Sequence, residues 1–236
     1  PCGVASAKNI RTAYLKALDS DPISAFGGVV LFNRKMNEDL ARLLLNNFYE
    51  IVVATKYNKG SLNILKSKKK LIIIDSSFLI KKQKKIYKSV NSGTLYQDYN
   101  SYKISKSKIK LMSKKKSSDK ILNDLIFAFK VTKHVKSNAI VLVNNKQTLG
   151  IGAGQMSRVD STKIAIMKYK QFFKYKYFVC ASDAFFPFTD NIQRLLKLKC
   201  IGIIQPSGSI NDEKIINYSN KKNVSLYFVK NRVFKH

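Results

Sequence analysis

A chain of 236 residues with 45% hydrophobic residues is long enough to bury a core as one large domain or two lobes, and it contains no run of 18 apolar residues that would span a membrane. Its net charge of +30, from 44 basic and 14 acidic residues, first suggests a nucleic-acid partner. Only six of the basic residues are arginine, which base recognition and bidentate phosphate binding favour, so the composition favours a lysine-rich, solvated surface instead.

The first 77 residues alternate between helix-like and strand-like patterns. Helices are predicted over 7–20, from about 37 to 48 and over 58–66, and strands over 29–32, 50–55 and 71–75. This alternation predicts a largely parallel or mixed α/β sheet that is covered on both faces. We expect the strand over 29–32 to be buried, Asn37 to cap the second helix, and Phe48 to face inward.

Residues 78–116 differ from their surroundings because they are rich in lysine and serine and only weakly periodic. One strand-like piece stands out, over 94–99. We interpret the region as a connector between two α/β lobes, and its lysine clusters as a solvated face rather than a binding stripe. A strongly periodic helix follows over 118–134, with Ser118 or Asp119 as its N-cap.

Residues 117–236 repeat the alternation of strands and helices. Strands are predicted over 139–143, 148–151, 177–181, 200–204 and 225–229, a turn over 205–209, and helices over 157–173, 191–198 and from Asn211, as N-cap, to 221. The similar order of elements in residues 1–77 and 117–236 suggests a duplicated α/β lobe on either side of the connector.

The stretch 135–160 combines two short strands, a glycine-rich turn and the start of a helix. The glycines of GIGAG (150–154) have no side chains, so the backbone there can closely approach a neighbouring group. Ser157 with Asp160 forms a capping box. Unpaired N–H groups and the guanidinium of Arg158 would suit an anionic or carbonyl-bearing ligand. The spacing matches neither a dinucleotide fingerprint nor a P-loop, and a glycine-rich turn that binds nothing stays open as an alternative.

Polar and aromatic candidates collect near the predicted strand ends, where open α/β sheets bind ligands. They are Glu50, Asn138, Arg158, Asp183, Phe185, Phe186, Asp190, Ser209 and Arg232. An aromatic ring at such an edge can stack on a flat heterocycle. Each candidate also has an ordinary structural explanation, such as a solvated carboxylate, a helix cap or a core aromatic.

No constellation for metal binding or nucleophilic catalysis is visible in the sequence. His134 and His236 are too isolated to form a metal cluster. The three cysteines, Cys2, Cys180 and Cys200, are widely spaced and give neither a disulfide framework nor a CxxC pair. Such cysteine usage favours a reducing, cytosolic compartment. No Ser-His-Asp or Cys-His pairing can be drawn.

Six motifs taken together resemble one family. They are SDPISAFGGVV (20–30), VKSNAIV (135–141), GIGAGQMSRV (150–159), ASDAFFPFTDNI (181–192), IQPSGSIND (204–212) and NRVFKH (231–236). In order and at compatible distances, they resemble the AICAR transformylase part of the bifunctional purine biosynthesis enzyme. The resemblance covers nearly the whole chain and departs clearly only in the lysine-rich region 78–116.

The resemblance implies formyl transfer from 10-formyltetrahydrofolate to the 5-amino group of AICAR, giving FAICAR late in de novo purine synthesis. It implies two cytidine-deaminase-like α/β/α lobes, here 1–77, incomplete at its N-terminus, and 117–236, joined by the connector 78–116. Members of the family require no metal and form homodimers with active sites at the interface. We therefore expect a cytoplasmic homodimer that binds AICAR and the folate, with neither a membrane nor a specific nucleic acid as partner.

Individual residues carry over where the motifs match. The resemblance assigns nucleotide contacts to Gly27, Glu50, Asn138, Arg158, Phe185 and Arg232, and folate contacts to Val159, Asp190, Ser209 and Ile210. Chemically, two guanidinium groups suit the phosphate and carboxamide of AICAR, and an aromatic ring suits its flat imidazole. A carboxylate suits the N–H-rich edge of a pterin.

The resemblance also implies that the family's catalytic groups are not among the residues of this sequence. In the family, a Lys-His pair that supplies the general base and stabilises the transition state lies a few residues ahead of the position of Pro1, and an IMP cyclohydrolase domain precedes it. We expect this chain to be the carboxyl-terminal part of the bifunctional enzyme, with Asn138 in a supporting role; loss of a positioned general base costs about 10²–10⁴-fold. The alternatives are a non-catalytic relic that still folds and a basic nucleic-acid-binding protein.

Overall fold

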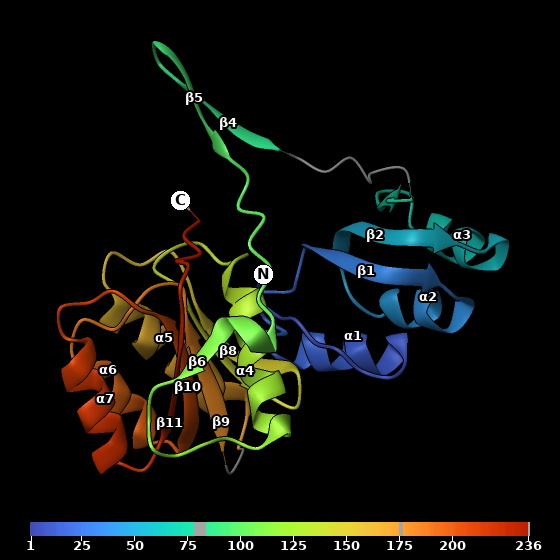
Figure 1. Ribbon diagram of the computed structural model, residues 1–236. Coiled ribbons are helices and arrows are strands. Elements are labelled where there is room, and N and C mark those ends of the chain that lie inside the picture. Colours follow the sequence, from blue (N-terminus) through green and yellow to red (C-terminus); the bar gives the residue numbers. More distant parts are fainter. Residues whose placement is uncertain (78–83, 175–176, 236) are drawn as a thin grey trace. The chain divides into compact units, whose positions relative to one another are not determined.

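The computed structural model describes residues 1–77, 84–174 and 177–235, and the chain forms two compact units (Figure 1). The large unit comprises Pro1–Ser24 and Lys103–His236, and the small unit comprises Ala25–Tyr102. Residues 1–24 thus group with the second expected lobe, and the expected connector is divided between the units. The assignment of lobes to 1–77 and 117–236 stays a prediction.

The large unit is built on a six-stranded mixed sheet (Figure 1). In spatial order its strands are β6 (Ile109–Leu111), β11 (Ser225–Val229), β10 (Cys200–Pro206), β9 (Phe178–Ser182), β7 (Ile140–Asn144) and β8 (Gln147–Gly152). Strands β9, β10 and β11 are parallel, β7 runs antiparallel to β8 and β9, and β6 runs antiparallel to β11. Every residue of β7, β9 and β11 is buried, as in strands that are covered on both faces.

Helices cover both faces of this sheet. They are α4 (Asp119–Thr132), α5 (Arg158–Phe172), α6 (Asp190–Leu196) and α7 (Asp212–Lys221), and α1 (Ile10–Asp19) contacts β8. Residues of α5, α6 and α7 share one buried cluster with Ile140, Cys180 and Ile203. Val141 and Ala181 point to the opposite face because strand side chains alternate, and they are buried where α4 packs against β7 and β9. The predicted α/β class is confirmed.

Helix α5 lies very close to β8. A Cβ atom placed on Gly150 would lie 2.1 Å from the carbonyl oxygen of Ala165, and one placed on Gly152 would lie 1.8 Å from that of Ser161. Both distances are far inside van der Waals contact, so only glycine allows this approach. Gly154, with a φ of +68°, then turns the chain toward the helix. The first two glycines of GIGAG therefore serve helix–sheet packing.

The small unit contains a three-stranded parallel sheet in the order β1–β2–β3. Its elements are β1 (Gly28–Met36), α2 (Glu38–Leu44), β2 (Tyr49–Tyr57), α3 (Lys59–Lys66) and β3 (Ile72–Asp75). The predicted cap of α2 is confirmed, since the side chain of Asn37 accepts from the N–H of Leu40, and Asn58 caps α3 in the same way. The core of the unit includes Leu40 and Val52, which are fully buried.

Two burial predictions for the small unit are wrong. The strand expected to be buried over 29–32 exposes 62% of Val29 and 69% of Leu31, because alternate side chains of β1 point away from the face that holds Phe32. Phe48, expected to face inward on a helix, follows the end of α2 and is 47% exposed, with its ring 5.1 Å from that of Phe26.

The region expected to be a connector contains more regular structure than its pattern indicates. The predicted piece at 94–99 corresponds to β5 (Gly93–Asp98), which pairs antiparallel with β4 (Lys85–Val90), a strand the sequence analysis missed. Strand β6 was missed as well, because its three residues are ordered by pairing with β11 more than 100 residues away. Residues 78–83 lie outside the described residues.

Helix caps in the large unit follow the predictions with one exception. Ser118 caps α4, and Ser157 accepts from the N–H of Asp160 at the start of α5. Asn211 stands at the N-cap position of α7, but its side chain makes no capping bond; its amide donates to the carbonyl of Pro187 instead, at 2.9 Å. The turn expected over 205–209 begins later, since β10 extends through Pro206.

Within the residues that the structure describes, no helix has both the length and the apolar character needed to cross a membrane.

We predict that Gly152→Ala lowers the free energy of unfolding of the large unit by about 1–3 kcal/mol or more, because the new methyl group forces α5 away from β8. Urea unfolding followed by circular dichroism measures the change. Gly93→Ala is the matched control, since a Cβ atom there has no neighbour within 4 Å among the described residues. It should change stability by less than about 0.5 kcal/mol. Equal stability of the two variants would contradict the packing role.

Candidate functional site

The predicted site residues of the large unit follow the strand ends at one edge of its sheet. Residues 183–190 follow β9, 207–212 follow β10, and Arg232 follows β11. Because β7 is antiparallel to these strands, its beginning, next to Asn138, lies at the same edge, as does the end of β8, which leads into α5. The topology therefore gathers these segments where open α/β sheets bind ligands.

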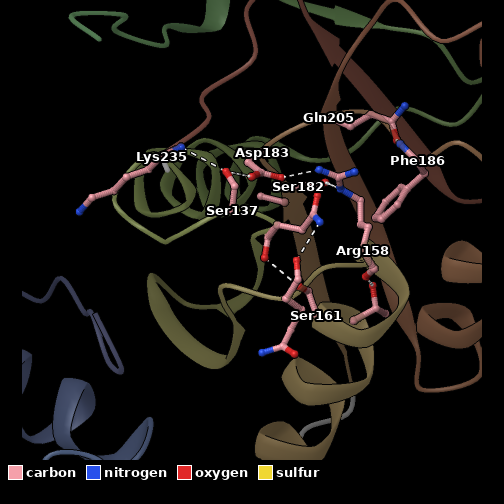
Figure 2. Close-up of polar contacts among 12 residues, drawn as sticks. Ser137, Arg158, Ser161, Ser182, Asp183, Phe186, Gln205 and Lys235 are labelled. Carbon is pink, nitrogen blue, oxygen red and sulfur yellow. Dashed lines mark hydrogen bonds and ion pairs between the residues drawn. The ribbon is translucent and has the colours of Figure 1, made fainter. Parts of the chain in front are cut away.

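The centre of this edge is an ion pair between Arg158 and Asp183 (Figure 2). Arg158 Nη2 lies 2.8 Å from Asp183 Oδ1, and Arg158 Nε donates to Ser182 Oγ at 2.9 Å. The side chain of Asp183 is fully buried and that of Arg158 is 11% exposed. In such surroundings the pair is weakly screened, and the guanidinium is held in a fixed orientation.

The other oxygen of Asp183 binds a hydroxyl group. Ser137 Oγ donates to Asp183 Oδ2 at 2.5 Å and accepts from the N–H of Lys235 at 3.1 Å (Figure 2). The N–H of Ser137 donates to the carbonyl of Lys235, and the N–H of Val233 donates to the carbonyl of Asp183. These bonds fix segment 231–235 against the beginning of β7 and the end of β9.

Asn138 is engaged with the loop that leads into α5. Its amide nitrogen donates to the carbonyls of Gln155 and Met156, at 2.9 and 3.0 Å. Its backbone carbonyl accepts from Ser161 Oγ at 2.7 Å. The side-chain amide therefore holds the loop in place, and its carbonyl oxygen is the atom that can accept a hydrogen bond from a ligand.

A second guanidinium lies over an aromatic ring. The Cζ atom of Arg232 is 4.7 Å from the centre of the Phe185 ring, which is a cation–π contact. Arg232 is exposed, Phe185 is half-buried and Phe186 is fully buried. Gly208, with a φ of +105°, brings the loop after β10 close to Arg232, since a Cβ there would lie 3.9 Å from Nη2. Of the two phenylalanines, Phe185 is thus the one available to a ligand, and Phe186 is a core residue.

Several buried polar atoms near Asp190 lack a partner in the part of the chain that the structure describes. They are Asp190 Oδ1, Asn191 Oδ1 and Nδ2, Gln205 Nε2 and Asp212 Oδ1. Buried polar groups are normally satisfied, so each of these atoms is a candidate to bind a polar ligand or a water molecule. Sequence reasoning missed Asn191 and Gln205. The signal for Gln205 is a polar residue at the end of an apolar strand; its Oε1 accepts from the N–H of Phe186 at 3.2 Å.

The remaining predicted folate contacts lie on the loop surface. Ile210 is fully exposed, while Ser209 shapes the loop: its hydroxyl accepts from the N–H of Asn211 and its carbonyl from that of Asp212. Val159 is half-buried in the first turn of α5. An exposed apolar side chain beside buried polar atoms would suit a ligand with a flat polar ring and an apolar face.

Gly27 and Glu50 lie in the small unit, close to each other. Gly27 has a φ of +67° and donates its N–H to the carbonyl of Phe48. A Cβ atom on Gly27 would lie 4.0 Å from Glu50 Oε1, so the turn leaves the exposed carboxylate of Glu50 beside an open backbone.

The described residues offer neither a reactive thiol at Cys180 or Cys200 nor a cluster of metal ligands. Burial raises the pKa of Cys180 well above its usual value, with the neighbouring Cys200 adding to the shift, and burial raises the pKa of Cys200 to about 12. Neither thiol is therefore a nucleophile, because the thiolate is the reactive form. No group of three His, Cys, Asp or Glu residues that could hold a metal ion occurs in the described ranges, which do not include His236.

We predict that Arg158→Ala lowers the free energy of unfolding by about 3–5 kcal/mol, because it leaves the carboxylate of Asp183 buried without its cationic partner. Urea titration measures the loss. Lys163→Ala is the control, since its ion pair with Asp160 is half-exposed, and it should change stability little. A stable Arg158→Ala variant would show that the pair is not structurally important.

Comparison with known proteins assigns the chain to a family. A family model described as "AICARFT/IMPCHase bienzyme" matches residues 1–168. Over its full length the chain is 45% identical to the bifunctional purine biosynthesis protein PurH of Wigglesworthia glossinidia brevipalpis, covering 45% of that protein. It is 45% identical to PurH of Caldicellulosiruptor bescii and 42% identical to PurH of Aquifex aeolicus, covering 46% of each.

The chain thus spans about half the length of these curated relatives. The match runs through the whole chain, so both compact units and every residue of the candidate site lie within it. This chain belongs to the AICARFT/IMPCHase bienzyme family.

Proposed function

We propose that this chain binds AICAR and 10-formyltetrahydrofolate and takes part in the transfer of the formyl group to the 5-amino group of AICAR, giving FAICAR in purine synthesis. The observation that supports this most is the gathering of Asn138, Arg158, Phe185 and Arg232 at one edge of the large sheet. These residues come from segments 135–141, 150–159, 181–192 and 231–236, which carry the resemblance to the transformylase.

The chemistry of the nucleotide fits these groups. Arg158 and Arg232 supply N–H donors for a phosphate and a carboxamide oxygen. Phe185 offers a ring face to the imidazole, and Asn138 offers a carbonyl oxygen to an amino group. For Gly27 and Glu50 of the small unit, the resemblance implies nucleotide contacts as well, and the carboxylate of Glu50 suits ribose hydroxyls.

The folate is proposed to bind beside the end of β10. Asp190, Asn191 and Gln205 place acceptors and donors in buried positions, where they have no partner among the residues that the structure describes. Such groups suit the N–H and carbonyl edge of a pterin. Val159, Ser209 and Ile210 border this region. No metal is needed for the transfer, and we propose that proton transfer falls to the Lys-His pair that the resemblance places ahead of Pro1.

We also infer that the fold consists of two cytidine-deaminase-like lobes. Its support is a repeated pattern: β9–α6–β10–α7–β11 and β1–α2–β2–α3–β3 are both all-parallel, with neighbouring strands in sequence order. A cytoplasmic location is proposed on the basis of the pathway and the three free cysteines.

We predict that the chain binds AICAR and that Arg232→Ala weakens this binding by about tenfold to a hundredfold, because one charge-assisted contact is lost. Isothermal titration calorimetry with AICAR measures the affinity. Arg11→Ala, which removes an exposed arginine on α1, is the matched control and should bind like the unchanged chain. Absence of AICAR binding by the folded chain would refute the proposed nucleotide site.

We further predict a homodimer, as the resemblance implies. Sedimentation equilibrium over a range of concentrations should give a mass near twice the 26.8 kDa of the chain. A well-folded monomer that binds AICAR would contradict the predicted dimer but would not contradict the proposed nucleotide site.

A further inference from the structure

Asp183 is a buried acidic residue that the proposed function does not use. It follows β9, its side chain is fully buried, and it lies in a chain with a net charge of +30. A buried carboxylate costs desolvation energy that only good partners offset, so its partners indicate what it does. Both of its oxygens are engaged, Oδ1 with Arg158 and Oδ2 with Ser137.

On the Oδ1 side, Asp183 fixes one edge of the Arg158 guanidinium. Nη2 donates to Asp183 and Nε donates to Ser182 Oγ, which locks both the plane and the direction of the group (Figure 2). A guanidinium has five N–H donors, and within the described residues only these two donate to protein. The other three N–H groups have no protein acceptor among these residues and are left for a ligand.

On the Oδ2 side, Asp183 is connected to the segment that carries Arg232. Ser137 Oγ donates to Asp183 and accepts from the N–H of Lys235, so the hydroxyl proton is committed to the carboxylate. The carbonyl of Asp183 also accepts from the N–H of Val233. Asp183 therefore orients Arg158 directly. It also holds the backbone just after Arg232, at Val233 directly and at Lys235 through Ser137, in the segment where Arg232 lies over Phe185.

We propose that Asp183 is a positioning residue for nucleotide binding, which holds the guanidinium groups of Arg158 and Arg232 in place before the ligand arrives. This inference rests on the proposed function. Asp183 need not touch the ligand, since its carboxylate is enclosed by Arg158, Ser137 and the backbone. It contributes by removing the cost of ordering two long, flexible side chains when the nucleotide binds.

The test is a double-mutant cycle on AICAR affinity, measured by calorimetry on the full chain. Asp183→Asn keeps the shape of the side chain and removes its charge, and it should weaken binding about tenfold to a hundredfold. In the Arg158→Ala background, Asp183→Asn should weaken binding only by the part that acts through segment 231–235, about threefold to tenfold, because the guanidinium that it orients directly is gone. Asp119→Asn, the same change in an exposed ion pair with Lys106, is the control and should bind normally.

The outcomes separate this inference from the function on which it rests. The positioning role alone would be overturned if the wild-type chain binds AICAR and the Asp183→Asn variant binds it equally well. It would also be overturned if the losses of affinity in Asp183→Asn and Arg158→Ala are fully additive. A folded wild-type chain that does not bind AICAR would overturn the proposed function and the inference with it.

A second variant covers the case in which Asp183→Asn does not fold. Ser137→Ala removes one hydroxyl and leaves the ion pair intact, so it tests the connection to segment 231–235. It should weaken AICAR binding about threefold to tenfold, and this loss should disappear in an Arg232→Ala background. An unchanged affinity in Ser137→Ala would overturn the role of Asp183 in placing Arg232.

Discussion

The close packing of α5 on β8 is the constraint on which the arrangement of the candidate site depends. Gly150 and Gly152 let the helix approach so closely that carbonyl oxygens of its first turns occupy the space of the missing side chains. This contact fixes the start of α5, where Ser157 caps the helix and Arg158 leaves it toward the end of β9. A rigid helix thus carries the guanidinium of Arg158. Gly150 and Gly152, in the glycine-rich stretch that suggested a ligand-binding turn, make room for this helix and not for a ligand.

Charge is used in two different ways in this chain. The lysines that dominate the composition are mostly exposed and set the overall field, which is long-range and screened by salt. The arginines of the site are few and individually held: Arg158 by a buried carboxylate and Arg232 over an aromatic ring. Because local partners determine orientation, the net charge of +30 says little about what the site recognises.

Local sequence signals account for much of the fold. Periodicity and capping residues were sufficient for α4 and α5, and strand-end reasoning pointed to the edge where Asn138 and Arg158 lie. The exposure of Val29 and the strand β6 were not predictable in this way, because both depend on which neighbours lie beside them. Likewise, Asp183 was one candidate among many, and only its partners single it out.

The hydrogen bonds that order Arg232 join residues far apart in the chain. Lys235 binds Ser137 across 98 positions, and the backbone of Asp183 meets that of Val233 across 50. Contacts between residues far apart in sequence require the closure of long loops. The loss of chain entropy on closure opposes the contact before the contact itself contributes any stabilisation. Segment 231–235 bonds both to Ser137, ahead of β7, and to Asp183, after β9, so it is held in place only where these two strands are already paired.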